Sequence, residues 1–280
     1  ARRRYRALAD MSQDIDRVLH GLDSQTIAAC DEGELAILSS EIRKMTVRLR
    51  QAADSQHRER MQLADAMADI SHQLRTPLTA INLTLSMLGR EGLPEQERRA
   101  FLQELRRLVT RMEWLVETLL KMSRIDAGAV SFREESCRAA DIIRRAVQPL
   151  AVPMELRGIT LETAAGEECF TGDAAWSAEA LGNVLKNCME HAASYIRVSA
   201  RETALFTEIT VQDDGPGFRA EDLPRLFERF YRGKDAAPAS VGIGLALARM
   251  VLSAQNGTIR ADNACPGGAL FTLRWYRSTV

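Results

Sequence analysis

Two apolar runs with a seven-residue repeat constrain the fold of this chain more than any other feature. The first run consists of Leu63, Met67, Ile70, Leu74, Pro77/Leu78, Ile81, Leu85 and Leu88. After the turn GREGLPEQ, the second run consists of Leu102, Leu105, Val109, Met112, Val116 and Leu119. Two such helices joined by a short Gly/Pro turn predict an antiparallel hairpin. Because a lone hairpin cannot bury both faces of its apolar stripe, the pattern predicts a homodimer with a four-helix bundle.

The chain before the hairpin is also helical in character, with one interruption. The segment GLDSQTIAACDEG, residues 21–33, breaks the pattern, and the helix is expected to resume at Glu34. Steps of three and four then place apolar residues on one helical face, at Leu35, Leu38, Ile42, Met45 and Leu49. A plain coiled-coil stalk is one interpretation of this segment.

The chain changes character after RIDAG, residues 124–128. Several short segments alternate apolar and polar residues, namely YIRVSA (195–200), LFTEITVQ (205–212), GTIRAD (257–262) and ALFTLRWY (269–276). Helical stretches are expected at about 139–150, 174–193 and 243–255. This order predicts an α/β sandwich in which helices cover one face of a mixed sheet.

Composition excludes several classes of protein. The 37 basic and 38 acidic residues leave a formal charge of −1, so no global field favours nucleic acid. The 5 cysteines are scattered without a CxxC pair, which argues against a disulfide framework or a zinc site. No apolar run is long enough to span a bilayer. The sequence starts at Ala1 with Arg2, Arg3, Arg4 and Arg6, and this cluster is either a solvated basic end or the cytoplasmic flank of a missing transmembrane helix.

His72 lies on the first helix of the hairpin but off the apolar stripe. It follows Ile70 by two residues, about 200° around the helix, so we expect it to face outward. A structural histidine would more often lie on the stripe. Thr76 lies one turn further on the same face, where its hydroxyl could position a water. Pro77 cannot donate to the carbonyl of Gln73, which predicts a bend in this helix.

Polar and glycine clusters in the C-terminal part indicate a phosphate ligand. Asn183 and Asn187 recur at helical spacing, and paired amide oxygens can orient Mg²⁺ and its waters; two solvated asparagines are the alternative. The segment DDGPG, residues 213–217, ends a strand in a glycine turn. GIGLALA, residues 242–248, begins a helix with two glycines, which lets a phosphate approach backbone N–H groups.

The order of these segments resembles the bacterial sensor histidine kinases of two-component systems, over roughly residues 60 to 275. SHQLRTPL resembles their phospho-acceptor box, and EALGNVLKN resembles their asparagine box. DDGPG, LFERFYRG and GIGLALA resemble the first glycine box, the phenylalanine box and the second glycine box. The upstream DEGELAILSSEIRKMT resembles the second half of a HAMP-type helix pair more weakly.

The resemblance implies three parts. Residues 1–60 would be a HAMP-like or signalling-helix segment, and 61–128 the dimerisation and phospho-acceptor hairpin. Residues 129–280 would be an ATP-binding catalytic domain, with an α/β sandwich of the gyrase, histidine-kinase and mismatch-repair ATPase type. The whole would be the cytoplasmic part of a bacterial inner-membrane protein, attached to the membrane through a missing N-terminal transmembrane region.

The resemblance also implies a role for each residue that matches a motif. His72 would accept the γ-phosphoryl group of ATP, and Asn187, helped by Asn183, would hold Mg²⁺. Asp213 would accept a hydrogen bond from the adenine amino group. The remaining candidates are glycines and arginines, in the following roles: Gly215 and Gly217 opening space for the base, Gly242 and Gly244 admitting the phosphates, and Arg229 and Arg232 lying near the phosphates at the edge of a mobile lid, about 218–241.

The phosphoryl group would then pass from His72 to an aspartate of a separate response regulator. The resemblance also allows phosphatase activity. Because the catalytic domain must swing to His72 and back, Pro77 is interpreted as a hinge in the helix just after the phosphate acceptor.

The sequence departs from the family pattern at the histidine and in the asparagine box. Gln73 occupies the position where many relatives have an acidic general base, and Glu190 and His191 stand where a lysine and a tyrosine are common. Asp69, three residues before His72, is either a substitute base or an ordinary solvated aspartate.

Two other functions compete with the kinase. Gln73 and Glu190 favour an ATP-binding dimeric scaffold with little phosphotransfer. An ATPase related to gyrase and mismatch-repair proteins would lack the phospho-acceptor hairpin, so the stretch DISHQLRTPLT argues against it.

Overall fold

The computed structural model describes residues 34–90, 92–233, 240–265 and 267–277. The chain divides into two compact units, residues 1–71 and 72–280. The predicted break at 21–33 and the basic start of the chain lie outside the described residues. Within these ranges, no helix combines the length and apolar character that a membrane crossing needs.

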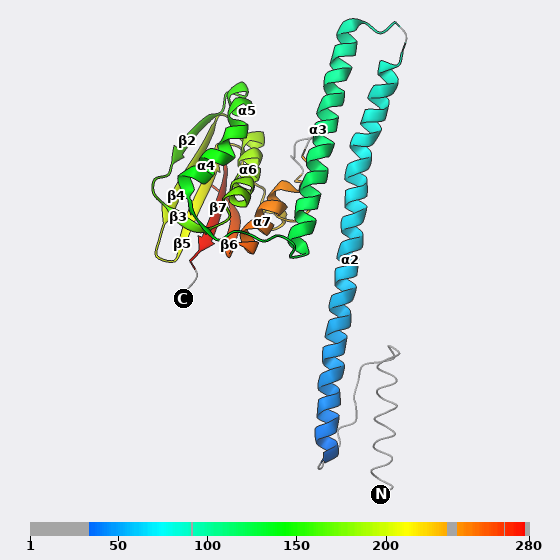
Figure 1. Cartoon of the computed structure of the whole chain (residues 1–280), viewed down its shortest axis with the longest axis vertical. Helices are drawn as coiled ribbons and strands as arrows, with labels where there is room; N and C mark the ends of the chain where they lie inside the picture. The colour runs from blue at the N-terminus through cyan, green and yellow to red at the C-terminus, as the bar shows by residue number, and fades with distance from the viewer. Residues whose placement is uncertain (1–33, 91, 234–239, 266, 278–280) are drawn as a thin grey trace. The chain divides into compact units, whose positions relative to one another are not determined.

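The predicted helical hairpin is confirmed. Helix α2 (Glu34–Leu88) has 55 residues, and helix α3 (Glu95–Asp126) has 32. The Gly/Pro turn separates them, and α3 runs antiparallel to the part of α2 that follows residue 71 (Figure 1). Glu95 and Glu97 occupy the first turn of α3, where acidic side chains stabilise the positive end of the helix dipole.

The apolar stripe of the hairpin is only partly buried within this chain. The buried apolar residues of α3 lie off this stripe: Leu108, Leu115 and Met122 are at most 5% exposed, and Leu115 and Met122 belong to the core of the C-terminal part. Other apolar residues of the same two helices are between 41% and 50% exposed, namely Leu78, Leu85, Leu102, Val109 and Val116. Part of the stripe therefore has no cover from the described residues of the chain.

Helix α2 continues through Pro77, which lies in its interior and is buried. Hydroxyl groups on either side donate to carbonyl oxygens four residues earlier in the helix. Thr76 donates to the carbonyl of His72 at 3.3 Å, and Thr79 donates to the carbonyl of Arg75 at 2.9 Å. Such back-bonding often bends a helix, so the segment combines two local causes of bending.

The C-terminal part contains a five-stranded mixed sheet with the order β2-β4-β5-β7-β6. Strand β2 pairs in parallel with β4, and the other neighbours pair antiparallel. A separate two-stranded sheet pairs β1 with β3. The strands are β1 (Glu135–Arg138), β2 (Thr160–Ala164), β3 (Cys169–Gly172), β4 (Tyr195–Glu202), β5 (Phe206–Asp213), β6 (Gly257–Asn263) and β7 (Ala269–Tyr276).

Three helices cover one face of this sheet, as the sequence predicted (Figure 1). They are α4 (Ala139–Val147), α6 (Ala174–His191) and α7 (Gly244–Ala254). Strand residues on this face are fully or nearly fully buried, including Ile209, Val211 and Phe271. The opposite face is polar, with Ser199 and Thr210 sharing a hydrogen bond of 2.7 Å. This alternation is the reason why these strands could be predicted.

The strands and helices that the sequence did not predict are short. They are β1, β2, β3 and α5 (Ala151–Leu156), which have between 4 and 6 residues. Strand β2 is exposed at four of its five positions, so its sequence shows no alternation between apolar and polar residues.

Candidate functional site

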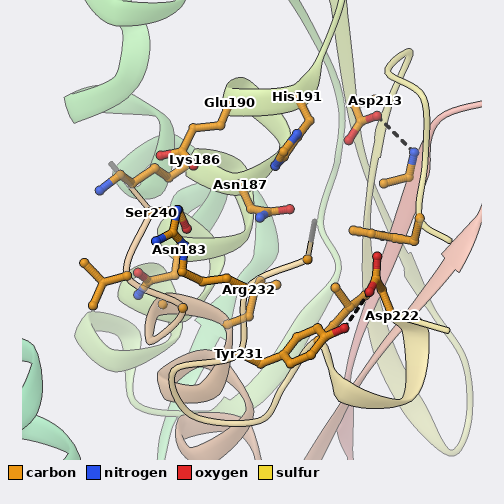
Figure 2. Close-up of a pocket in the computed structure, with 18 of the residues that line it drawn as sticks. Asn183, Lys186, Asn187, Glu190, His191, Asp213, Asp222, Tyr231, Arg232 and Ser240 are labelled. Atoms are coloured by element: carbon orange, nitrogen blue, oxygen red, sulfur yellow. Dashed lines mark hydrogen bonds between the residues drawn. The ribbon is translucent and has the colours of Figure 1, made fainter. Parts of the chain in front are cut away.

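A cavity of about 390 Å³ lies between α6, the start of α7 and the segment that follows β5. Its volume is in the usual range for small-molecule sites. Figure 2 shows residues of α6 on one side of it and Asp213 of β5 on the other. The residues expected at the site that line it are Asn183, Asn187, Asp213, Gly217, Arg232, Gly242 and Gly244.

Helix α6 positions the two asparagines. Its N-cap residue Asp173 accepts the N–H groups of Ala175 and Trp176, at 3.0 and 3.2 Å, which fixes the start of the helix. The opposite side of α6 is buried in the core. Asn183 donates its side-chain amide to the carbonyl of Glu179 at 3.0 Å. Its amide oxygen therefore remains as an acceptor on the cavity side.

Asp213 is the last residue of β5 and is 2% exposed. Its Oδ1 accepts the backbone N–H groups of Gly215 and Ala269, each at 2.9 Å. Its Oδ2 is buried and has no hydrogen-bond partner among the described residues. A buried carboxylate oxygen without a donor is costly, so this atom marks a place where a ligand donor would be stabilising.

Asp214 follows Asp213 but holds the chain instead of facing the cavity. Its carboxylate accepts the backbone N–H groups of Ala193, Ser194 and Tyr195, and also the Ser194 hydroxyl. Desolvation raises the pKa of Asp214, but the hydrogen bonds from Ser194, Tyr195 and Ala193 outweigh it and lower the pKa to about 2. Asp214 thus fixes the connection between α6 and β4.

The first glycine pair makes room for protein atoms. A Cβ at Gly215 would lie 2.5 Å from the carbonyl oxygen of His191, and Gly215 does not line the cavity. Gly217 does line the cavity, has φ of +72°, and a Cβ there would meet Asn263 at 2.6 Å. Both glycines were expected to open space for a base. In the structure the space beside them is taken by protein atoms, namely the His191 carbonyl at Gly215 and the Asn263 side chain at Gly217.

The second glycine pair joins the cavity to the start of α7. Gly242 has φ of +77°, and a Cβ there would lie 2.3 Å from the carbonyl oxygen of Tyr231. A Cβ at Gly244 would lie 2.8 Å from the Asn183 amide oxygen. Gly242 requires glycine, because its φ is positive and backbone atoms crowd it, whereas the atom nearest Gly244 is the end of the Asn183 side chain. Both glycines line the cavity at the start of α7.

The segment expected to form a lid, about 218–241, is described except for residues 234–239. Tyr231 donates its hydroxyl to Asp222 at 2.5 Å, and this hydrogen bond raises the pKa of Tyr231. The guanidinium of Arg225 lies 4.3 Å from the centroid of the Tyr231 ring. Phe230 has φ of 62°, a strained value for a bulky residue.

The two arginines of the phenylalanine box lie in different places. Arg232 lines the cavity, as expected. Arg229 does not; its guanidinium forms an ion pair of 2.7 Å with Asp126 at the end of α3. The expectation that Arg229 lies near the phosphates is therefore not met in this structure, because Asp126 binds its charge outside the cavity.

The expected residues on α2 do not line the cavity. His72, Thr76 and Asp69 are all exposed. The outward placement of His72 agrees with the helical pattern. His72, the expected phosphate acceptor, is therefore not part of the cavity wall in this structure.

Several cavity residues were not proposed as site residues from the sequence. They include Trp114, Lys186, Asp222 and Tyr231. Lys186 could have been found, since it shares the helical face of Asn183 and Glu190. Trp114 could not, because it comes from α3 and only the tertiary structure brings it to this wall.

The described residues contain no cluster of side chains that could bind a metal ion without ligands from another molecule. Across residues 34–90, 92–233, 240–265 and 267–277, no three histidine, cysteine, aspartate or glutamate side chains are arranged to hold a metal ion. Asn183 and Asn187, the two side chains expected to hold Mg²⁺, both line the cavity.

Two family models match the chain. Residues 62–128 match the His Kinase A (phospho-acceptor) domain. Residues 172–279 match the Histidine kinase-, DNA gyrase B-, and HSP90-like ATPase domain. The first range contains His72, and the second contains every residue that lines the cavity except Trp114.

Curated relatives named as histidine-protein kinases match this chain. The signal transduction histidine-protein kinase AfsQ2 of Streptomyces coelicolor is 34% identical over 221 residues, which is 74% of this chain and 41% of the relative. The histidine-protein kinase/phosphatase MprB of Mycolicibacterium smegmatis is 31% identical over 280 residues, 96% of this chain and 54% of the relative. The chain thus spans about half the length of these relatives.

Solved structures share the fold. The Acinetobacter baumannii histidine kinase AdeS superposes with a TM-score of 0.61 at 20% identity, covering 74% of this chain and 98% of AdeS. Full-length ShkA, solved in complex with AMPPNP, superposes with a TM-score of 0.56 at 19% identity, covering 77% of this chain and 46% of ShkA. Together, the two matched domains, the hairpin and the mixed sheet place this chain in the family of two-component sensor histidine kinases.

Proposed function

We propose that this chain is the catalytic part of a sensor histidine kinase, which transfers the γ-phosphoryl group of ATP to His72 and then to an aspartate of a response regulator. The observation that carries the proposal is the buried Oδ2 of Asp213, which has no partner among the described residues. A purine amino group is a donor that fits such an oxygen.

The rest of the cavity suits the other end of ATP. The start of α7 contributes backbone N–H groups and the positive end of a helix dipole, both of which favour phosphate. Arg232 adds positive charge on the cavity wall. Asn187, helped by Asn183, would hold Mg²⁺, which would neutralise charge on the transferring phosphate.

The chemistry at His72 requires an exposed nucleophile. A lone pair on an imidazole nitrogen attacks the γ-phosphorus, the bond to the β-phosphate oxygen breaks, and ADP leaves. The proton displaced from the imidazole passes to a base or to water. His72 is exposed on α2, so a catalytic domain can approach it. Because His72 does not line the cavity here, the reaction needs a movement, for which Pro77 is the proposed hinge.

The proposed kinase consists of three parts and acts at a membrane. Residues 1–60 would be a signalling segment, 61–128 the dimerisation hairpin and 129–280 the ATP-binding domain. The chain would act as a homodimer on the cytoplasmic side of a bacterial inner membrane, attached through a region before residue 1. The name of MprB includes phosphatase activity, and Thr76 is the residue proposed to position water for that reaction here.

The test is incubation with γ-labelled ATP. We expect a label that is stable in base and lost in acid, as phosphohistidine is. His72→Gln should remove the label without weakening nucleotide binding. Asp213→Asn should remove it by weakening nucleotide binding about 10- to 100-fold, because an amide N–H then faces the adenine donor.

Asp213→Asn is also a controlled change for folding, since the amide oxygen can still accept the N–H groups of Gly215 and Ala269. Persistent labelling of His72→Gln would show that another residue is the phosphate acceptor. An Asp213→Asn variant that binds ATP as the parent does would disprove the assigned nucleotide site.

The second candidate is an ATP-binding scaffold with little phosphotransfer. The observation in its favour is Glu190, whose carboxylate belongs to the cavity lining. A parent chain that binds ATP but acquires no acid-labile label, alone or with a response regulator present, would support the scaffold.

A further inference from the structure

Lys186 lies on the cavity face of α6, directly before Asn187. Asn183, Lys186, Asn187 and Glu190 follow one another in steps of three, one and three residues, and all four line the cavity. Figure 2 shows Lys186 and Glu190 next to each other, on the side of the cavity away from Asp213. If the base lies at Asp213, the phosphates extend toward this side, where Glu190 is unfavourable and a cation is needed.

The Lys186 ammonium contacts an aromatic ring from another helix. It lies 4.4 Å from the centroid of the Trp114 ring of α3, and Trp114 itself lines the cavity. No carboxylate among the described residues forms a salt bridge with it. A cation–π contact of this kind is weak when exposed to solvent, and the four-carbon stem of lysine can rotate to another partner.

We infer that Lys186 is a phosphate-binding cation of this chain, in addition to Arg232. It compensates for the negative charge of Glu190 on the same helical face, and Trp114 competes with the phosphates for its ammonium. The inference rests on the proposed nucleotide function and goes beyond it, because Lys186 lies within EALGNVLKN but has no role implied by the family resemblance. It also predicts that the hairpin, through Trp114, influences nucleotide affinity.

The first test compares ligands with and without phosphates. Lys186→Gln should weaken binding of ATP and ADP about tenfold and leave binding of adenosine unchanged, since only the phosphates contact the lysine. Lys186→Arg should restore most of the affinity for ATP. Glu190→Gln should change ATP binding in the opposite direction to Lys186→Gln, by raising the affinity.

The second test is chemical labelling with an acyl phosphate of ATP. The Lys186 amine attacks the acyl carbon, the bond to the phosphate oxygen breaks, ATP leaves and the amine loses its proton to solvent. The sequence contains only 4 lysines, so mass spectrometry can assign the acylated peptide. Lys121, which forms salt bridges with Glu117 and Glu179, is the control that should stay unlabelled. Excess ATP should protect Lys186.

The third test isolates the role of Trp114. Trp114→Leu should tighten ATP binding a few-fold in the parent but have no effect in the Lys186→Gln background, because the contact is then already absent. Equal effects in both backgrounds would overturn the proposed competition.

These experiments distinguish a wrong role for Lys186 from a wrong nucleotide site. If the parent binds ATP and adenosine but Lys186→Gln binds ATP equally well, or if Lys186 is not acylated, the inference is wrong and the kinase proposal stands. If the parent binds neither ATP nor adenosine, the nucleotide site itself is wrong, and the inference fails with it.

Discussion

At the scale of single residues, two neighbouring aspartates have different tasks. Asp213 uses one carboxylate oxygen for backbone N–H groups and leaves the other, buried oxygen on the cavity side. Asp214 uses its carboxylate to accept three backbone N–H groups and a hydroxyl. The first is therefore suited to a ligand, while the second stabilises the loop that follows α6.

The depressed pKa of Asp214 predicts an acid-sensitive contribution to stability. Its pKa falls from 3.8 to about 2 on folding, so the unfolded chain binds more protons between these values. The stabilisation is therefore complete above about pH 4 and is lost as the pH falls toward 2. Urea unfolding of the parent and of Asp214→Asn should show a stability difference that shrinks over this range. Parallel curves between pH 5 and pH 2.5 would contradict this assignment.

The base that assists His72 is a second question at this scale. Gln73 cannot take a proton, whereas Asp69 is an exposed carboxylate three residues before His72 on α2. If Asp69 is the base, Asp69→Asn should slow autophosphorylation by about 10²-fold or more at saturating ATP. Gln73→Glu should restore most of the rate in the double variant. A rate equal to that of the parent in Asp69→Asn would mean that Asp69 has no catalytic part.

At the scale of elements, the site depends on contacts between the segment before α7 and LFERFYRG, residues 226–233. The N–H of Phe230 donates to the carbonyl of Gly242 at 2.9 Å, and Gly242 needs a left-handed conformation next to Tyr231. Tyr231 is in turn bonded to Asp222. These contacts hold the start of α7 against the cavity.

Gly242→Ala should therefore damage both stability and the site. The added Cβ would lie 2.3 Å from the Tyr231 carbonyl oxygen at a positive φ, so we expect a loss of about 1–3 kcal/mol in the free energy of unfolding. ATP binding should weaken as well. Gly267→Ala is the matched control, since a Cβ there meets nothing within 4 Å. If both variants unfold at the same denaturant concentration, the close contact at Gly242 does not constrain the loop.

At the scale of the whole molecule, the hairpin leaves an apolar surface without cover from the described residues. Leu102, Val109 and Val116 are spaced by seven residues on α3 and are 41–45% exposed. A repeat of this spacing is typical of a helix that packs along another helix. A second copy of the hairpin would supply the missing partner, in the four-helix bundle that the sequence predicts.

Val116→Glu should weaken or abolish the dimer, because a charge would be buried between the hairpins. Sedimentation equilibrium measures this directly, and the parent should be a dimer at micromolar concentration. Thr110→Glu adds the same charge to an exposed position of α3 off this seven-residue repeat and is expected to leave the dimer intact. A monomeric parent, or a Val116→Glu variant that remains as dimeric as the parent, would show that this apolar repeat of α3 does not form the dimer interface.

The sequence by itself determined the parts of this protein whose signal is local and periodic. The seven-residue repeat predicted the hairpin, and the alternation of apolar residues predicted β4 to β7, because in both cases burial of one face selects the spacing. Short segments without such a pattern, such as β2 and α5, were missed. Motifs at fixed spacing also placed Asn183, Asn187 and Asp213 correctly on α6 and at the end of β5.

Only the tertiary structure decided the contacts between segments distant in sequence. It placed Arg229 with Asp126, showed that Gly215 makes room for the His191 carbonyl, and brought Trp114 to Lys186. The physical reason is that each of these depends on which charges, carbonyls and rings packing brings within a few ångströms of one another. Such distances leave no periodic trace along the chain.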